Sequence, residues 1–224
     1  MRLLAAILLA TTPLAITPLA APAAAQPAAP IRDRFPHNDV SRQLASPTGD
    51  LPASIKALQT TLTELQQLAL QTKQAHWNVS GTLFYPLHEL LQDHYTGISK
   101  YADECAERLL AIGVSSDGRA STIVRTSAIP EYPGGFTDDA AVIKWFAATY
   151  LTADRVTQAG IQATNKTDPT TSNLLQEIDN VLSKYQWQMR AHLQETATDA
   201  NRGVDIGAPN APAPAVSGPA PTFK

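Results

Sequence analysis

Cysteine and charged residues are both scarce in this sequence. Cys105 is the single cysteine among 224 residues, which excludes an intrachain disulfide and a zinc site built from several cysteines. We interpret Cys105 as a small buried helix residue, the alternative being a disulfide between chains in an oxidising compartment. Charged residues make up 17% of the chain and the formal net charge is −3. A weakly acidic protein exerts no long-range attraction on nucleic acid or anionic lipid.

Long apolar runs are also missing. Residues 3–15 are almost wholly apolar, but they are fewer than the roughly 18–20 that a membrane-spanning helix needs. They follow Arg2 and precede small residues that end at Ala25, which is the pattern of a signal peptide cleaved before Gln26. We therefore expect residues 1–25 to be removed and the mature protein to be exported to the periplasm or secreted, without a membrane segment. A retained membrane anchor is the alternative.

Helical periodicity is confined to the middle of the chain. Residues 26–50 and 201–224 are rich in proline and alanine and predict flexible tails. Within residues 51–200, apolar side chains recur at steps of three and four, and strand-like alternation is missing. Long helices are predicted at residues 52–78, 83–112, 138–165 and 170–198, with a short one at 121–126. This pattern predicts an all-α four-helix bundle with a long crossover connection after the second helix.

The usual di-iron signature of helix bundles, Glu-x-x-His on each of two helices, is absent. Two other clusters contain residues that suit iron, manganese or zinc. His76 and His88 flank a tight turn, and Asp103 and Glu107 share one helix face. His88 and Asp103 are separated by roughly 22 Å of helix, at about 1.5 Å per residue. Either the clusters are unrelated polar surface residues, or an antiparallel two-fold pair of chains brings one against the other.

The sequences around both clusters resemble the Dps family of the ferritin superfamily. Residues 75–79 read Ala-His-Trp-Asn-Val and residues 87–89 read Leu-His-Glu, while residues 101–108 read Tyr-Ala-Asp-Glu-Cys-Ala-Glu-Arg. Further similarity lies at residues 117–119, 130–133 and 184–187, so that the likeness covers roughly residues 52–197.

The resemblance implies a ferritin-like fold and a homo-oligomeric shell, a dodecamer built from two-fold dimers. It implies ferroxidase sites at the two-fold interfaces, with His76 and His88 from one subunit and Asp103 and Glu107 from its partner as catalytic metal ligands. There Fe²⁺ would bind as a mono-iron or di-iron centre and be oxidised, preferably by hydrogen peroxide. The ferric product would be stored as mineral, which protects against oxidative damage. Zinc or manganese is an alternative occupant. Trp77 would either intercept a stray oxidising equivalent or simply pack.

The sequence departs from the family pattern at Gln92, where the family usually has an acid four residues after the second histidine. A neutral amide is a poorer iron ligand than a carboxylate, so we treat Gln92 as a neighbour of the site and a candidate ligand. It leaves open a second function, a metal-binding cage with little or no ferroxidase turnover. A third, a helical interaction protein that binds no metal, also stays open.

Two further expectations concern the tails and the pores. The mature N-terminal tail contains no lysine, and its arginines are offset by aspartates. Because DNA binding depends on clustered cations, we expect none. The resemblance also implies acidic pores on three-fold axes, near the end of the third helix, for which Asp154 and Asp168 are the candidates.

Overall fold

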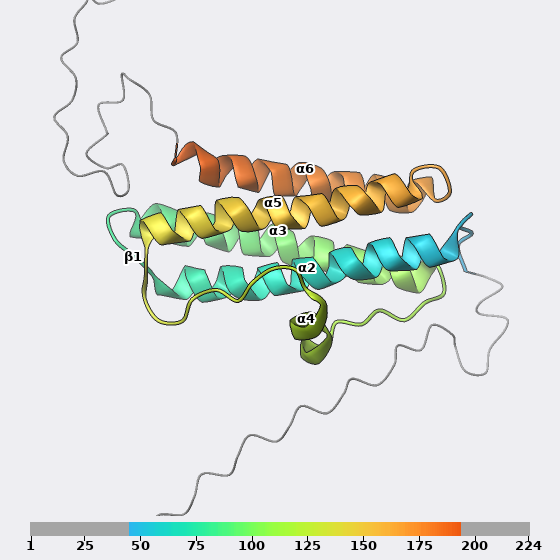
Figure 1. Ribbon diagram of the computed structural model, residues 1–224, viewed down its shortest axis with the longest axis horizontal. Coiled ribbons are helices and arrows are strands. Elements are labelled where there is room, and N and C mark those ends of the chain that lie inside the picture. The colour runs from blue at the N-terminus through green and yellow to red at the C-terminus, as the bar shows by residue number, and fades with distance from the viewer. Residues whose placement is uncertain (1–44, 194–224) are drawn as a thin grey trace, which may run out of the picture.

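The computed structural model describes residues 45–193, which form a bundle of four long helices (Figure 1). These are α2 (Leu51–Asn78), α3 (Phe84–Ala111), α5 (Asp139–Thr164) and α6 (Pro169–Ala191), with the short helix α4 (Ala120–Thr126) in the connection after α3. The predicted all-α bundle with a long crossover is thus confirmed, although α6 ends earlier than residue 198. The predicted signal peptide, residues 26–44 of the first tail and the predicted C-terminal tail lie outside the described residues.

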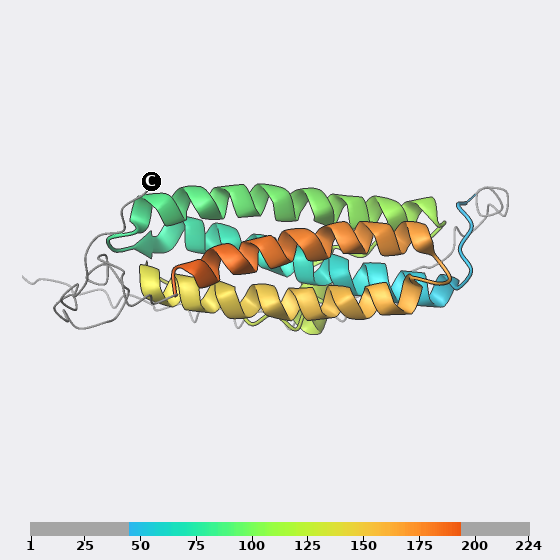
Figure 2. The ribbon, with the colours of Figure 1, turned by 90° about the horizontal axis from the view of Figure 1, so that it is seen from above.

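The bundle consists of two helical hairpins that share one apolar core. Figure 2 shows α6 lying between α3 and α5, so that the α5–α6 hairpin closes on the α2–α3 hairpin. Fully buried side chains come from all four long helices: Leu58, Leu62, Leu65, Leu68, Leu87, Leu91, Ile98, Leu109, Ile143, Phe146, Tyr150 and Leu175. Burying one such side chain contributes about 1.5–3 kcal/mol, which is why the three- and four-residue periodicity is enough to specify these faces.

The turn between α2 and α3 is fastened to the start of α5. The strand β1 (Val79–Ser80) pairs in parallel with β2 (Thr137–Asp138), the last residues of the crossover. Gly81 has a φ of +115°, and a Cβ there would meet the carboxylate of Asp139, which accepts a 2.9 Å hydrogen bond from the Leu83 amide. The sequence did not predict these strands because the pairing partners are far apart in the chain.

The crossover is held against α2 by polar side chains of that helix, one of them the buried Glu64. The carboxylate of Glu64 accepts hydrogen bonds from the Ser127 hydroxyl at 2.7 Å and from the Ala128 amide at 2.8 Å. The Gln71 side chain accepts another from the Tyr132 amide at 2.7 Å. These bonds satisfy backbone groups of a connection that forms no regular ladder of its own.

The opposite end of the bundle anchors the segment before α2. The Ser46 amide donates to the Ala111 carbonyl, and the Gly49 amide donates to the Thr167 carbonyl at 2.7 Å. Asp50 caps α2 by accepting from the Ala53 amide. The last residues of the predicted N-terminal tail therefore lie against the bundle. Among residues 45–193, none of the helices combines the length and apolarity that a membrane crossing requires.

Candidate metal centre between subunits

The two histidines form a reciprocal pair at the turn between α2 and α3. The His76 and His88 rings stack with centroids 3.8 Å apart and planes inclined by 20°. Nδ1 of each ring lies 2.8 Å from the backbone carbonyl oxygen of the other residue. A carbonyl oxygen can only accept, so each Nδ1 carries the hydrogen. In the neutral rings both Nε2 atoms therefore keep a lone pair, the form that binds metal.

The surroundings of His76 favour its neutral form. Burial lowers the pKa of His76, and the charges of His88 and Lys73 lower it further against the opposing hydrogen bond to the His88 carbonyl. The His88 side chain is 30% exposed, with its Nε2 4.0 Å from the Glu89 carboxylate. The pair thus has one covered ring and one that faces solvent. Because its pKa is lowered, His76 needs to release little proton on binding a metal.

The acidic cluster lies farther along α3. Asp103 and Glu107 are both exposed and one helical turn apart. Within residues 45–193 there is no group of three or more histidine, cysteine or acidic side chains that could together hold a metal ion. Each cluster is therefore at most part of a centre, as the helix length between them predicts.

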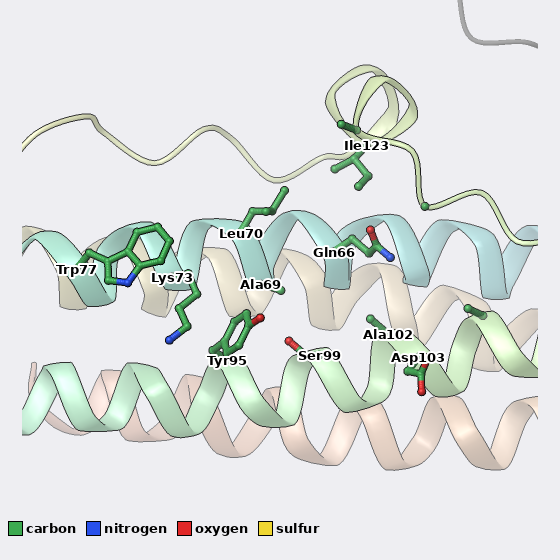
Figure 3. Close-up of a pocket in the computed structure, with 13 residues that line it drawn as sticks. Gln66, Ala69, Leu70, Lys73, Trp77, Tyr95, Ser99, Ala102, Asp103 and Ile123 are labelled. Carbon is green, nitrogen blue, oxygen red and sulfur yellow. The ribbon is translucent and has the colours of Figure 1, made fainter.

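A groove lies along one face of α2 and α3, and of the four candidate ligands only Asp103 lines it. Its volume is about 610 Å³, and its wall runs from Trp77, next to His76, to Asp103 (Figure 3). Leu70 of α2 and Ile123 of α4 also line it. Leu70 is 57% exposed and Trp77 64%, so apolar side chains of this face lack cover in the single subunit. Exposed aromatic and aliphatic side chains next to a groove are typical of an interface.

Lys73 is a further residue of the site, one that the sequence did not predict. Its Nζ donates to Oε1 of Gln92 and lies 4.7 Å from the centroid of the Tyr95 ring. The Gln92 amide in turn donates to the Thr96 hydroxyl at 3.3 Å. Gln92 therefore faces a cation, and it would have to release Lys73 in order to bind iron. The spacing in the sequence could have pointed to Lys73, since it precedes His76 by three residues on the same helix face.

Asp168, a pore candidate, caps α6 inside the subunit. Its side chain is 2% exposed and accepts bonds from the amide and hydroxyl of Thr171 and from the Ser54 hydroxyl. It also forms an ion pair with Arg108 at 2.9 Å. In the subunit the carboxylate is thus engaged in fastening α2, α3 and α6 together. Its role as a pore residue stays a prediction.

Asp154, the other pore candidate, is buried on α5 beside Asp179 of α6. Its carboxyl accepts from Ser183 at 3.4 Å and from Gln158 at 3.3 Å. Burial, followed by the hydrogen bond and charge of Asp179, raises the pKa of Asp154 to about 7. Below about pH 7 the carboxyl of Asp154 is therefore mostly protonated, while its role in a pore stays a prediction as well.

The Asp154 pair predicts a pH dependence of stability. A carboxyl whose pKa is raised by folding stabilises the protein at low pH, and the contribution is lost as the pH rises through about 7. We expect the melting temperature of the wild type to fall between about pH 4 and 8 relative to that of Asp154→Asn, measured by circular dichroism across a pH series. The exposed Asp93→Asn is the control. Parallel profiles for wild type and Asp154→Asn would contradict this assignment.

Cys105 is fully buried in the core of the bundle. Burial raises the pKa of its thiol to about 12, so the reactive thiolate is scarcely formed. The interpretation of Cys105 as a small buried helix residue is thus confirmed.

Comparison with known proteins places this fold among ferritin-like proteins. The model of the family "Ferritin: Ferritin-like domain" matches residues 55–198. DNA protection during starvation protein 2 of Deinococcus radiodurans is 60% identical over 171 residues, which cover 76% of this chain and 71% of the relative. The fine tangled pili major subunit of Haemophilus ducreyi is 37% identical over 149 residues, covering 65% of this chain and 76% of that one.

Solved structures agree with these relatives. A crystal structure of a Dps protein from Deinococcus radiodurans superposes with a TM-score of 0.67 at 62% identity, covering 70% of this chain and 95% of that one. A Dps structure from Microbacterium arborescens, described as a high iron form, gives a TM-score of 0.64 at 32% identity. The match covers 68% of this chain and 99% of that one.

Proposed function

This chain belongs to the Dps family of ferritin-like proteins, and from that premise we propose that it is a ferroxidase that stores iron. Its substrate is Fe²⁺, which binds where His76 and His88 of one subunit meet Asp103 and Glu107 of a two-fold partner. The observation that carries the proposal is the reciprocal histidine pair, because its two Nδ1–carbonyl bonds direct both Nε2 lone pairs to a metal. The high iron form of the Microbacterium arborescens relative supports iron as the metal.

The second subunit supplies the acidic ligands that complete the centre at the histidines of the first. A two-fold axis makes the same contact twice, so antiparallel packing on the α2–α3 face forms two identical centres. The exposed Leu70 and Trp77 give that face apolar area to bury. We propose that such dimers assemble further into a twelve-subunit shell that encloses the mineral.

The chemistry follows from the charge of the two halves. The imidazoles supply neutral nitrogen ligands and the carboxylates supply negative charge, which stabilises Fe³⁺ more than Fe²⁺. Hydrogen peroxide accepts two electrons, one from each of two Fe²⁺ ions, and becomes two molecules of water as it takes up two protons. Because both electrons are accounted for, no hydroxyl radical is released, and the Fe³⁺ produced passes into mineral.

Anaerobic Fe²⁺ titration of the mature protein, followed by stoichiometric peroxide, tests the proposal through the ferric absorbance. We expect oxidation much faster than in protein-free buffer, with initial rates lowered at least about tenfold by either His88→Ala or Asp103→Ala. Asp93→Ala, which removes another exposed acid of α3, is the matched control and should retain the wild-type rate. No acceleration over buffer would refute the ferroxidase.

The Lys73–Gln92 contact favours a second candidate function, a cage that binds iron, zinc or manganese with little turnover. A neutral amide held by an ammonium weakens the centre where the family usually has an acid. If Gln92→Asp greatly increases peroxide-dependent oxidation, the natural centre is a weak catalyst and the cage gains support. If the wild type already oxidises iron quickly and Gln92→Asp adds little, the ferroxidase stands.

The ammonium of Lys73 also predicts an effect on affinity. The charge of Lys73 already lowers the pKa of His76, so removing it in Lys73→Met should strengthen Fe²⁺ binding by about tenfold, since a nearby like charge costs on the order of 1 kcal/mol or more. Lys56→Met makes the same change at an exposed position near the other end of α2 and should leave the affinity unaltered. Equal dissociation constants for Lys73→Met and wild type in the anaerobic titration would contradict the prediction.

We also propose that the protein is exported and that it does not bind DNA. The signal-like residues 1–25 support cleavage before Gln26 and a site of action outside the cytoplasm. Tails of residues 26–50 and 201–224 without clustered lysines support protection by iron removal rather than by coating DNA.

A further inference from the structure

A hydrogen-bonded chain of three polar side chains crosses the core of the bundle, and none of the three is a proposed metal ligand. His94 of α3 is 1% exposed. Its Nδ1 lies 2.8 Å from the hydroxyl of Tyr150 on α5, and its Nε2 lies 2.8 Å from Oε1 of Gln188 on α6. Three helices thus contribute one residue each to a chain that the proposed iron chemistry does not use.

The partners fix where the protons lie. The amide oxygen of Gln188 can only accept, so Nε2 of His94 carries a hydrogen. Burial lowers the pKa of His94 to about 4, and the ring is neutral at pH 7. Nδ1 is therefore bare and accepts the phenolic hydrogen of Tyr150. A buried phenol whose proton points at an imidazole lone pair can pass that proton on without contact with solvent.

Aromatic rings surround this contact and lead to the surface. The Tyr185 ring stacks on His94 with centroids 3.9 Å apart, and it lies 5.8 Å from the Tyr150 ring. Tyr185 itself is only half-buried. A Cβ at Gly97 would lie 2.1 Å from the Tyr185 hydroxyl, so glycine at that position leaves room for the phenol. The stack thus connects a buried phenol to one that reaches solvent.

Tyr150 and His94 lie in the same end of the bundle as the metal-binding candidates His76 and His88. Tyr150 lies beside Thr72, which precedes His76 by one turn of α2. His94 follows His88 by six residues. At about 1.5 Å per residue these separations are roughly 6 and 9 Å along the two helices.

We propose that Tyr150 and His94 form a proton-coupled redox pair that donates one electron to hydroxyl-radical-class oxidants. The source of these oxidants rests on the proposed function, since they arise in a side reaction, when a single Fe²⁺ passes one electron to peroxide in place of the two-electron reaction described above. Tyr150 loses an electron and becomes a neutral phenoxyl radical. Its O–H proton moves to Nδ1 of His94, forming an imidazolium whose Nε2–H still donates to Gln188. The oxidant gains the electron and becomes hydroxide, which solvent protonates to water. Later a further Fe²⁺ ion, which is oxidised to Fe³⁺, supplies one electron through Tyr185, and the imidazolium of His94 returns the proton to Tyr150.

The pair is first tested without iron, in the full mature protein. Flash photolysis of a ruthenium tris-bipyridine complex with persulfate supplies a one-electron oxidant, and electron paramagnetic resonance follows the tyrosyl radicals. Exposed tyrosines contribute short-lived signals. We expect a long-lived component that is lost in Tyr150→Phe and retained in Tyr132→Phe, which removes the hydroxyl of another buried tyrosine. It should also be lost in His94→Phe, which keeps Tyr150 and the stacked ring but removes the base.

The outcomes separate this inference from the ferroxidase. A long-lived signal that persists in Tyr150→Phe, or its absence from the wild type, overturns the pair and leaves His94 as a packed polar residue. Thermal unfolding and size-exclusion chromatography establish that each variant is folded and assembled. Repeating the experiment with Fe²⁺ and peroxide should give the same component. If only the photochemical signal appears, the redox pair stands and iron as the source of its oxidant fails.

Discussion

Co-assembly of two inactive variants, His88→Ala and Asp103→Ala, is expected to restore about a quarter of the wild-type ferroxidase activity. In a random mixture about half of the two-fold interfaces pair one subunit of each kind. Each mixed interface contains one centre that lacks both residues and one centre that is complete. The two variants alone have no complete centre, because each lacks one ligand at every interface. The measurement is the initial rate of peroxide-dependent Fe²⁺ oxidation after joint unfolding and refolding.

Two controls make this result specific. Mixing the folded variants without unfolding them leaves the interfaces unexchanged and should restore nothing. Co-assembly of His76→Ala with His88→Ala should also restore nothing, since both residues belong to the same half of each centre. Complementation by this second pair, or failure of the first pair to complement, would show that the histidines and acids do not share a centre between subunits.

Asp168→Ala is expected to lower the free energy of unfolding by about 3–5 kcal/mol. We expect no other single substitution of a polar side chain, at the end of the bundle where α6 begins, to destabilise the protein more. Asp168→Ala removes the cap of α6 and leaves the guanidinium of Arg108, whose side chain is 12% exposed, without its carboxylate. Asp138→Ala removes an exposed cap from α5 and should cost only about 1 kcal/mol. Urea denaturation followed by circular dichroism measures both free energies of unfolding.

The same carboxylate predicts a pH dependence opposite to that of Asp154. Burial alone would raise the pKa of Asp168, but the bonds from Thr171 and Ser54 and the charge of Arg108 outweigh it and lower the pKa below its ordinary value. The stabilisation is therefore fully present at neutral pH and is lost as the pH falls through the folded pKa. The difference in stability between wild type and Asp168→Ala should shrink in acid. A constant difference from pH 7 to pH 3 would contradict this account.

The helices could be predicted from the sequence because their apolar period is a local property. Leu58, Leu62, Leu65 and Leu68 define one face of α2, and all four are buried. The strands β1 and β2 could not be predicted, since two residues that pair across nearly sixty positions leave no local pattern. The role of Asp168 was equally hidden. As a cap it has a local signature, but its ion pair with Arg108 depends on how α3 packs beside α6.

The candidate site likewise has a part that the sequence could predict and a part that it could not. The sequence by itself determined that His76 and His88 flank one turn and that Asp103 lies too far along the helix to join them, since helical rise fixes that separation. Only the tertiary structure decided that the imidazoles stack with both Nδ1 atoms bonded to carbonyl oxygens and that Lys73 holds Gln92. It also decided that His94 meets Tyr150. Each of these contacts joins side chains from different helices, and their distances follow from packing rather than from spacing along the chain.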